Sequence, residues 1–123
     1  MARLETENNI LLSEFLGWKT DNKGRYITPF GEMDECGYIS HEYEKNNLQF
    51  DCDWNWLMLV VDKIESIEMH DGRTFTIDFY RDSVLIFEYG LTNNELIFTE
   101  GGGRRENLYN ACVEFVKWYN ENK

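Results

Sequence analysis

The residues best suited to bind a ligand form a glycine-rich segment near the C-terminus: Gly101, Gly102, Gly103, Arg104 and Arg105. Glycines let a backbone approach a ligand closely, and the free N–H groups at the start of a helix favour an anion. Two adjacent arginines add bidentate donors for phosphate. The Lys-Ser/Thr ending of a Walker A loop is missing. The segment therefore predicts a phosphate site of another type, with a flexible connection and solvated arginines as the alternative.

Aromatic residues outside the main apolar stripes of their helices are a second feature. Trp56, Tyr109 and Trp118 are of this kind. An aromatic face outside a core can stack on a nucleotide base or anchor a protein partner. We expect these residues to be buried in a homo-oligomer interface, and in the ligand-binding interpretation Trp56 or Trp118 holds the base of a phosphate-bearing ligand.

Metal binding and catalysis have little support. Residues 29–47 carry many ligand atoms, but no spacing matches an EF-hand, an HExxH helix or a zinc ribbon. The histidines, His41 and His70, do not lie beside a Ser or Cys in a nucleophile motif. We expect no metal, no cofactor and no catalytic residue. The candidate metal ligands considered are Glu32, Asp34, Glu35, Cys36, His41, Glu42 and Glu44.

The composition narrows the classes of partner. The 123 residues are 42% apolar and carry 12 basic against 23 acidic side chains, a net charge of −11. Such a chain should be repelled by nucleic acids and by anionic membranes. No apolar stretch approaches the roughly 20 residues that span a bilayer, and the N-terminus lacks the apolar region of a signal peptide. Cys36, Cys52 and Cys112 have no CxxC spacing, which fits a reducing cytoplasm.

The pattern of elements predicts one α+β domain over residues 1–123, in the order α-ββ-α-ββββ-α, with helices packed on a mostly antiparallel sheet. Helices are expected at residues 5–16, at 53–66 behind an Asp53 N-cap, and from the glycines to the C-terminus. The first hairpin is expected at 18–28 with its turn at 21–24, and residues 29–47 should be irregular. The remaining strands are expected at 48–51, 67–69, 75–79, 84–87 and 96–98.

The middle helix is unusual because apolar residues occupy two faces. One face carries Trp54, Leu57, Met58, Val61 and Ile64, and the other carries Trp56, Leu59 and Val60. A helix that is apolar on two sides must be buried on two sides. Either another element or a second copy of the chain must supply the extra cover, and we expect a homo-oligomer through Trp56, Leu59 and Val60. The last helix has one stripe: Leu108, Ala111, Cys112, Phe115, Val116 and Tyr119.

Three segments together resemble a known family. They are residues 14–18 (EFLGW), 53–66 (DWNWLMLVVDKIES) and 109–123 (YNACVEFVKWYNENK). The set resembles the phage ABA-sandwich-domain family of small phage and bacterial proteins, over about half of the chain. Relatives commonly carry proline where this chain has Leu59. The resemblance implies helices on both sides of a sheet and a mobile-element context, and it implies no catalytic residues.

These observations predict a non-enzymatic, phage-type binding protein of the host cytoplasm. It would capture a small phosphate-bearing ligand, such as a nucleotide signal of host defence. Gly101, Gly102, Gly103, Arg104 and Arg105 would hold the phosphate, and Trp56 or Trp118 the base. The alternative is an acidic interaction module that binds a basic host protein by mimicking the charge of DNA. A domain with only a structural role in its own assembly is a third interpretation.

Overall fold

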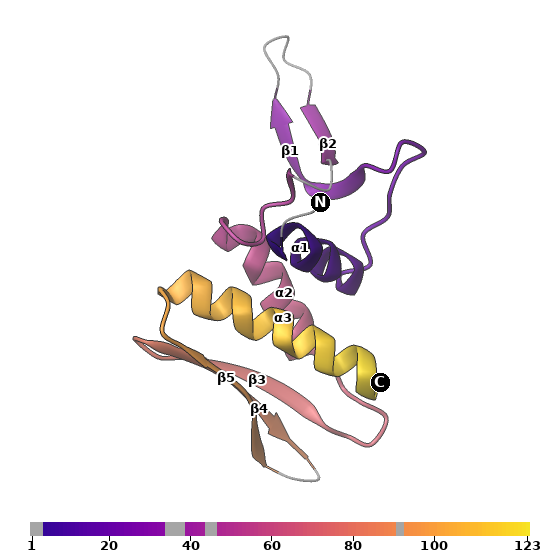
Figure 1. Ribbon diagram of the computed structural model, residues 1–123. Coiled ribbons are helices and arrows are strands. Elements are labelled where there is room, and N and C mark those ends of the chain that lie inside the picture. Colours follow the sequence, from indigo (N-terminus) through magenta and orange to yellow (C-terminus); the bar gives the residue numbers. More distant parts are fainter. Residues whose placement is uncertain (1–3, 34–38, 44–46, 91–92) are drawn as a thin grey trace. The chain divides into compact units, whose positions relative to one another are not determined.

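The computed structural model describes residues 4–33, 39–43, 47–90 and 93–123 (Figure 1). Over these residues the elements follow the order α-ββ-α-βββ-α, which confirms the α+β class. The chain forms two compact units, the N-terminal unit (Met1–Gln49) and the C-terminal unit (Phe50–Lys123), where the sequence predicted one domain. Within the described part of the chain, no helix is long and apolar enough to cross a bilayer.

The N-terminal unit begins with helix α1 (Leu4–Phe15), close to its predicted bounds. Gly17 ends this helix with a φ of +79°, a conformation in which side chains other than glycine are strained. The Gly17 N–H bonds the carbonyl of Glu14, and the Trp18 N–H bonds the carbonyl of Ser13. These two bonds satisfy carbonyl groups of the last turn, as a glycine stop requires.

The strands of this unit lie only in part where the sequence placed them. The predicted turn at 21–24 is present, and Asp21 accepts bonds from the backbone N–H groups of Lys23 and Arg25. The expected hairpin at 18–28 forms in a short version, with an antiparallel Thr20–Tyr26 bridge and a bond from the Ile27 N–H to the carbonyl of Lys19. Its return strand continues as β1 (Tyr26–Met33), which pairs antiparallel with β2 (Ile39–Tyr43), so the segment 29–47 is not irregular throughout as predicted.

Proline and glycine in β1 explain this error. Pro29 and Gly31 interrupt the pattern of a strand and are usually read as breakers. In a sheet of two strands, however, each strand is an edge, and an edge strand tolerates a residue that lacks an N–H group. The sequence pattern alone does not show that a strand is an edge.

The C-terminal unit is a three-stranded antiparallel sheet with two helices on one side (Figure 1). The strands, in the order β3-β4-β5, are β3 (Thr74–Phe79), β4 (Ser83–Tyr89) and β5 (Asn94–Glu100). Helix α2 (Trp54–Ser66) packs on β3, and helix α3 (Arg104–Asn122) packs on β4 and β5. The unit thus has two layers, whereas the family resemblance implied helices on both sides of a sheet.

Two predicted strands around these elements are absent. The expected strand at 67–69 is a single bridge between Glu68 and Thr74, and residues 48–51 contain no strand. The core between sheet and helices confirms the stripe of α3, of which only Tyr119 is half-buried. Phe75 of β3 meets Phe115 of α3 edge to face, with ring centroids 4.9 Å apart. This contact joins the two layers at their centre.

The apolar residues of α2 do not form two opposite faces. The buried residues Trp56, Leu57, Val60, Val61 and Ile64 form one continuous face. Trp54 and Met58, predicted to lie in the core, are 41% and 39% exposed. Trp56 and Val60 are already buried in a single chain, and Leu59 is half-buried. A second copy is therefore not needed to cover Trp56 and Val60, and the homo-oligomer stays a prediction.

Replacing Asp53 by alanine is expected to destabilise the protein by about 1 kcal/mol. The Asp53 carboxylate accepts a hydrogen bond of 2.8 Å from the Asn55 N–H group and so caps α2. Asp53→Asn keeps an acceptor at this position and should restore most of the loss. Urea unfolding followed by circular dichroism measures both changes. Equal losses in the two variants would contradict a capping role.

Candidate functional site

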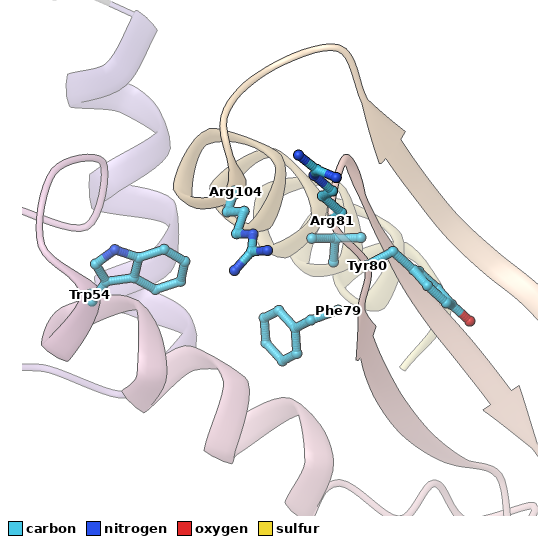
Figure 2. Close-up of a pocket in the computed structure, with 6 residues that line it drawn as sticks. Trp54, Phe79, Tyr80, Arg81 and Arg104 are labelled. Carbon is cyan, nitrogen blue, oxygen red and sulfur yellow. The ribbon is translucent and has the colours of Figure 1, made fainter.

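A pocket of about 320 Å³ opens in the C-terminal unit where α2 and α3 begin and β3 ends (Figure 2). Trp54 and Arg104 are the first residues of α2 and α3. Phe79 is the last residue of β3, and the turn into β4 follows it. The described residues that line the pocket are Trp54, Phe79, Tyr80, Arg81, Val84 and Arg104.

Three of these side chains converge on the same space. In Figure 2 the Arg104 side chain extends between Trp54 and Phe79, whose side chains lie on either side of it. Trp54 and Phe79 are 41% and 50% exposed, so their aromatic faces are accessible to a ligand. Tyr80 points outward, and the Arg81 guanidinium points away from Phe79. The centre of the pocket is therefore Trp54, Phe79 and Arg104, with Arg81 as a second cation on the rim.

The two pocket arginines differ from Arg25 and Arg73 in their ion-pair partners. Arg25 forms an ion pair with Asp21 at 3.0 Å, and Arg73 forms one with Asp71 at 2.8 Å. Among the described residues, neither Arg81 nor Arg104 has an ion-pair partner. In a chain of net charge −11, two unneutralised guanidinium groups at one pocket favour an anionic ligand.

Asn107, which the sequence analysis missed, holds the two arginine-bearing segments together. The residue is buried, with 1% of its surface exposed. Its side chain bonds three backbone groups. Its Oδ1 accepts from the Gly102 N–H at 3.1 Å, and its Nδ2 donates to the carbonyls of Gly102 at 3.1 Å and Asp82 at 3.2 Å. The loop before Arg104 is thereby tied to the turn that carries Arg81. The sequence did carry a signal for the burial of Asn107, which lies four residues before Ala111 and therefore on the apolar face of α3.

The three glycines shape the connection and do not line the pocket. Gly101 has a φ of +93°, which favours glycine at this turn. The N–H group of Gly102 bonds Asn107, and the Glu106 carboxylate lies over Gly102, 2.7 Å from the position that a Cβ atom would take. The Gly102 N–H is therefore already bonded, and the Glu106 carboxylate covers this glycine, so Gly102 is not open to a phosphate in this arrangement. The structure thus moves the candidate site from the glycines to the Arg104 side chain.

Arg105 also lies outside the described lining. Its charge is close enough to Cys52 to lower the pKa of that thiol, although burial and Asp51 raise it overall. Only Arg104 of the predicted arginine pair belongs to the pocket.

The two tryptophans predicted to stack on a base are occupied. Trp56 is 2% exposed and packs edge to face on Phe50, with centroids 5.2 Å apart. Trp118 packs against Phe75 at 5.6 Å and is covered by the Arg73 guanidinium at 5.5 Å. Trp56 is thus inaccessible to a ligand and Trp118 is half-buried, and Tyr109 is buried as well. The tryptophan that lines the pocket is Trp54. Helical periodicity predicted Trp54 to lie in the core, whereas the structure leaves it exposed.

The acidic segment considered for metal binding falls largely outside the described residues, which omit Asp34, Glu35, Cys36 and Glu44. Within the described part of the chain, no group of three or more His, Cys, Asp or Glu side chains is arranged to hold a metal ion.

Alkylation of the native protein is expected to modify Cys52 and to spare Cys112. Cys52 is exposed, whereas complete burial raises the pKa of Cys112 to about 12, so its reactive thiolate is scarce at pH 8. After unfolding in urea both cysteines should react. Peptide mass spectrometry following iodoacetamide treatment measures each site. Equal modification of both cysteines in the native protein would show that the core around α3 opens readily.

No protein-family model, curated protein or solved structure matches this chain. The resemblance to the phage ABA-sandwich-domain family stays a prediction from the three sequence segments.

Proposed function

We propose that this protein binds a small ligand that joins a phosphate group to a flat ring, as a nucleotide does, in the pocket of the C-terminal unit. One observation supports the proposal: two arginines without ion-pair partners among the described residues share a pocket with exposed aromatic side chains. Guanidinium groups match phosphate oxygens in geometry and charge. Aromatic faces match the rings of a base.

Each lining residue has a role in this proposal. Arg104, between the two aromatic side chains, donates to the phosphate, and Arg81 adds positive charge from the rim. Trp54 and Phe79 contact the flat ring. Val84, which is 1% exposed, provides apolar surface from β4.

Binding without turnover fits this lining. Its described residues include no carboxylate, histidine, serine or cysteine that could act as a general base or a nucleophile. If the resemblance to phage proteins reflects the source of the chain, the ligand would be a nucleotide signal of host defence, which the protein captures in the host cytoplasm.

Titration of the protein with AMP tests the proposal. Trp54 lies at the pocket, so a stacked base should change tryptophan fluorescence, and Trp54→Phe should remove most of that change. Isothermal titration calorimetry gives the affinity independently of the signal. Saturable binding with one site per chain would support the proposal. Absence of heat and of a fluorescence change with AMP, GMP and inorganic phosphate would contradict it.

A second candidate function, recognition of a basic protein, is favoured by the outer edge of the sheet. Strand β5 is an edge strand that exposes Glu95, Glu100 and Phe98, the last being 53% exposed. A basic partner bound there would be released by salt. Its affinity would fall on Glu95→Gln and Glu100→Gln and would not respond to Arg104→Ala, which separates it from nucleotide binding.

A further inference from the structure

The hydrogen-bonding groups that line the pocket determine which part of a nucleotide it can recognise. This inference rests on the proposed function. To distinguish bases, a site needs hydrogen-bonding groups at the base edge, typically amides, carboxylates or hydroxyls. The described lining contains no side-chain amide or carboxylate, its one hydroxyl belongs to Tyr80, which points outward, and the indole N–H of Trp54 is a single donor. The guanidinium groups of Arg81 and Arg104 only donate, so neither supplies an acceptor to a base edge, and Arg104 is the one assigned to the phosphate.

The aromatic contribution is tolerant of base identity. Trp54 and Phe79 offer faces to a ring, and stacking on an aromatic side chain is available to every base because every base has a π-face. Purines present more stacking area than pyrimidines. The pocket therefore separates bases by size and not by their hydrogen-bonding pattern.

The same lining leaves no place for a divalent cation. Protein-bound Mg²⁺ usually takes one or two carboxylates together with phosphate oxygens. The described lining has no carboxylate, and its positive charge comes from Arg81 and Arg104. Mg²⁺ on the phosphate would weaken the attraction that these arginines supply.

The volume of the pocket limits the size of the ligand. At about 320 Å³ it lies at the small end of ligand pockets, which suits one nucleotide unit.

From these observations we infer that the pocket takes nucleoside monophosphates as a class. It recognises the phosphate and the flat shape of the ring, does not read the identity of the base, and needs no metal ion.

A panel of ligands tests this inference by calorimetry: AMP, GMP, CMP and UMP, with adenosine and ribose 5-phosphate as half-ligands. AMP and GMP should bind within about 3-fold of each other, with CMP and UMP weaker by less than about 10-fold, because stacking alone separates them. Adenosine should lose at least about 10-fold, because it lacks the phosphate. Ribose 5-phosphate should lose about as much, because it lacks the ring. Affinities in EDTA should equal or exceed those in Mg²⁺.

The failing outcomes are distinct. A difference above about 30-fold between AMP and GMP would overturn recognition without base reading, while nucleotide binding itself would stand. A guanine preference that Arg81→Ala removes would show that Arg81 contacts the base edge. A requirement for Mg²⁺ would overturn the metal-free part. If no phosphate compound binds, the proposed function itself fails.

Discussion

Arg104→Ala is expected to weaken AMP binding by about 10- to 100-fold, which is the value of a charge-assisted hydrogen bond to a phosphate. The Arg104 side chain extends between the two aromatic residues of the pocket and has no ion-pair partner among the described residues. Arg104→Lys keeps the charge but loses the planar pair of donors, so an intermediate loss is expected. Fluorescence or calorimetric titration gives the affinities.

Two control variants, each of which removes one positive charge elsewhere on α3, test whether the effect is specific to Arg104. Lys117→Ala removes an exposed cation from the same helix, and Arg105→Ala removes the neighbouring arginine, which lies near Cys52. Each should change the affinity for AMP by less than about 3-fold, because neither residue is among the described lining of the pocket. A loss with Arg105→Ala as large as that with Arg104→Ala would place the phosphate at the start of α3, where the glycine-rich segment originally predicted it.

Asn107→Ala is expected to destabilise the protein by about 2–4 kcal/mol, because buried polar groups that lose their partners each cost about 1–3 kcal/mol. The Asn107 side chain bonds the N–H and carbonyl groups of Gly102 and the carbonyl of Asp82. Alanine leaves all three groups without this partner. Urea unfolding followed by circular dichroism measures the change.

Comparison variants separate this role from a general effect of altering α3. Asn110→Ala, at an exposed position of the helix, should change the free energy of unfolding by less than about 0.5 kcal/mol. Asn107→Asp keeps the acceptor for Gly102 but loses both donated bonds and buries a negative charge, so it should destabilise at least as much as alanine. If Asn107→Ala were as stable as Asn110→Ala, the loop would have to be held by other contacts, and Asn107 would have no positioning role.

The sequence by itself determined the helices and the class of the fold. Helical periodicity and local capping are properties of adjacent residues, so α1 with its Gly17 stop, α2 with its Asp53 cap, and the buried stripe of α3 all agree with the pattern. Alternation likewise predicted β3, and a continuous apolar run predicted β4, to within a residue or two. The pairing of β1 with β2 in the N-terminal unit was missed, because Pro29 and Gly31 are compatible with an edge strand, and pairing partners are not encoded locally.

The site shows the same division. The sequence identified Arg104, because glycines followed by arginines at a helix start are visible as a motif. It did not identify Trp54, Phe79 or Arg81, which come from a helix start, a strand end and a turn that are separated along the chain. Only the packing of α2 and α3 on the sheet places them around one pocket, and only the bonds of Asn107 tie the Arg81 turn to the loop before Arg104. Tertiary packing also buried Trp56 and left Trp54 exposed, since a helix made apolar on several sides does not itself determine which side meets the core.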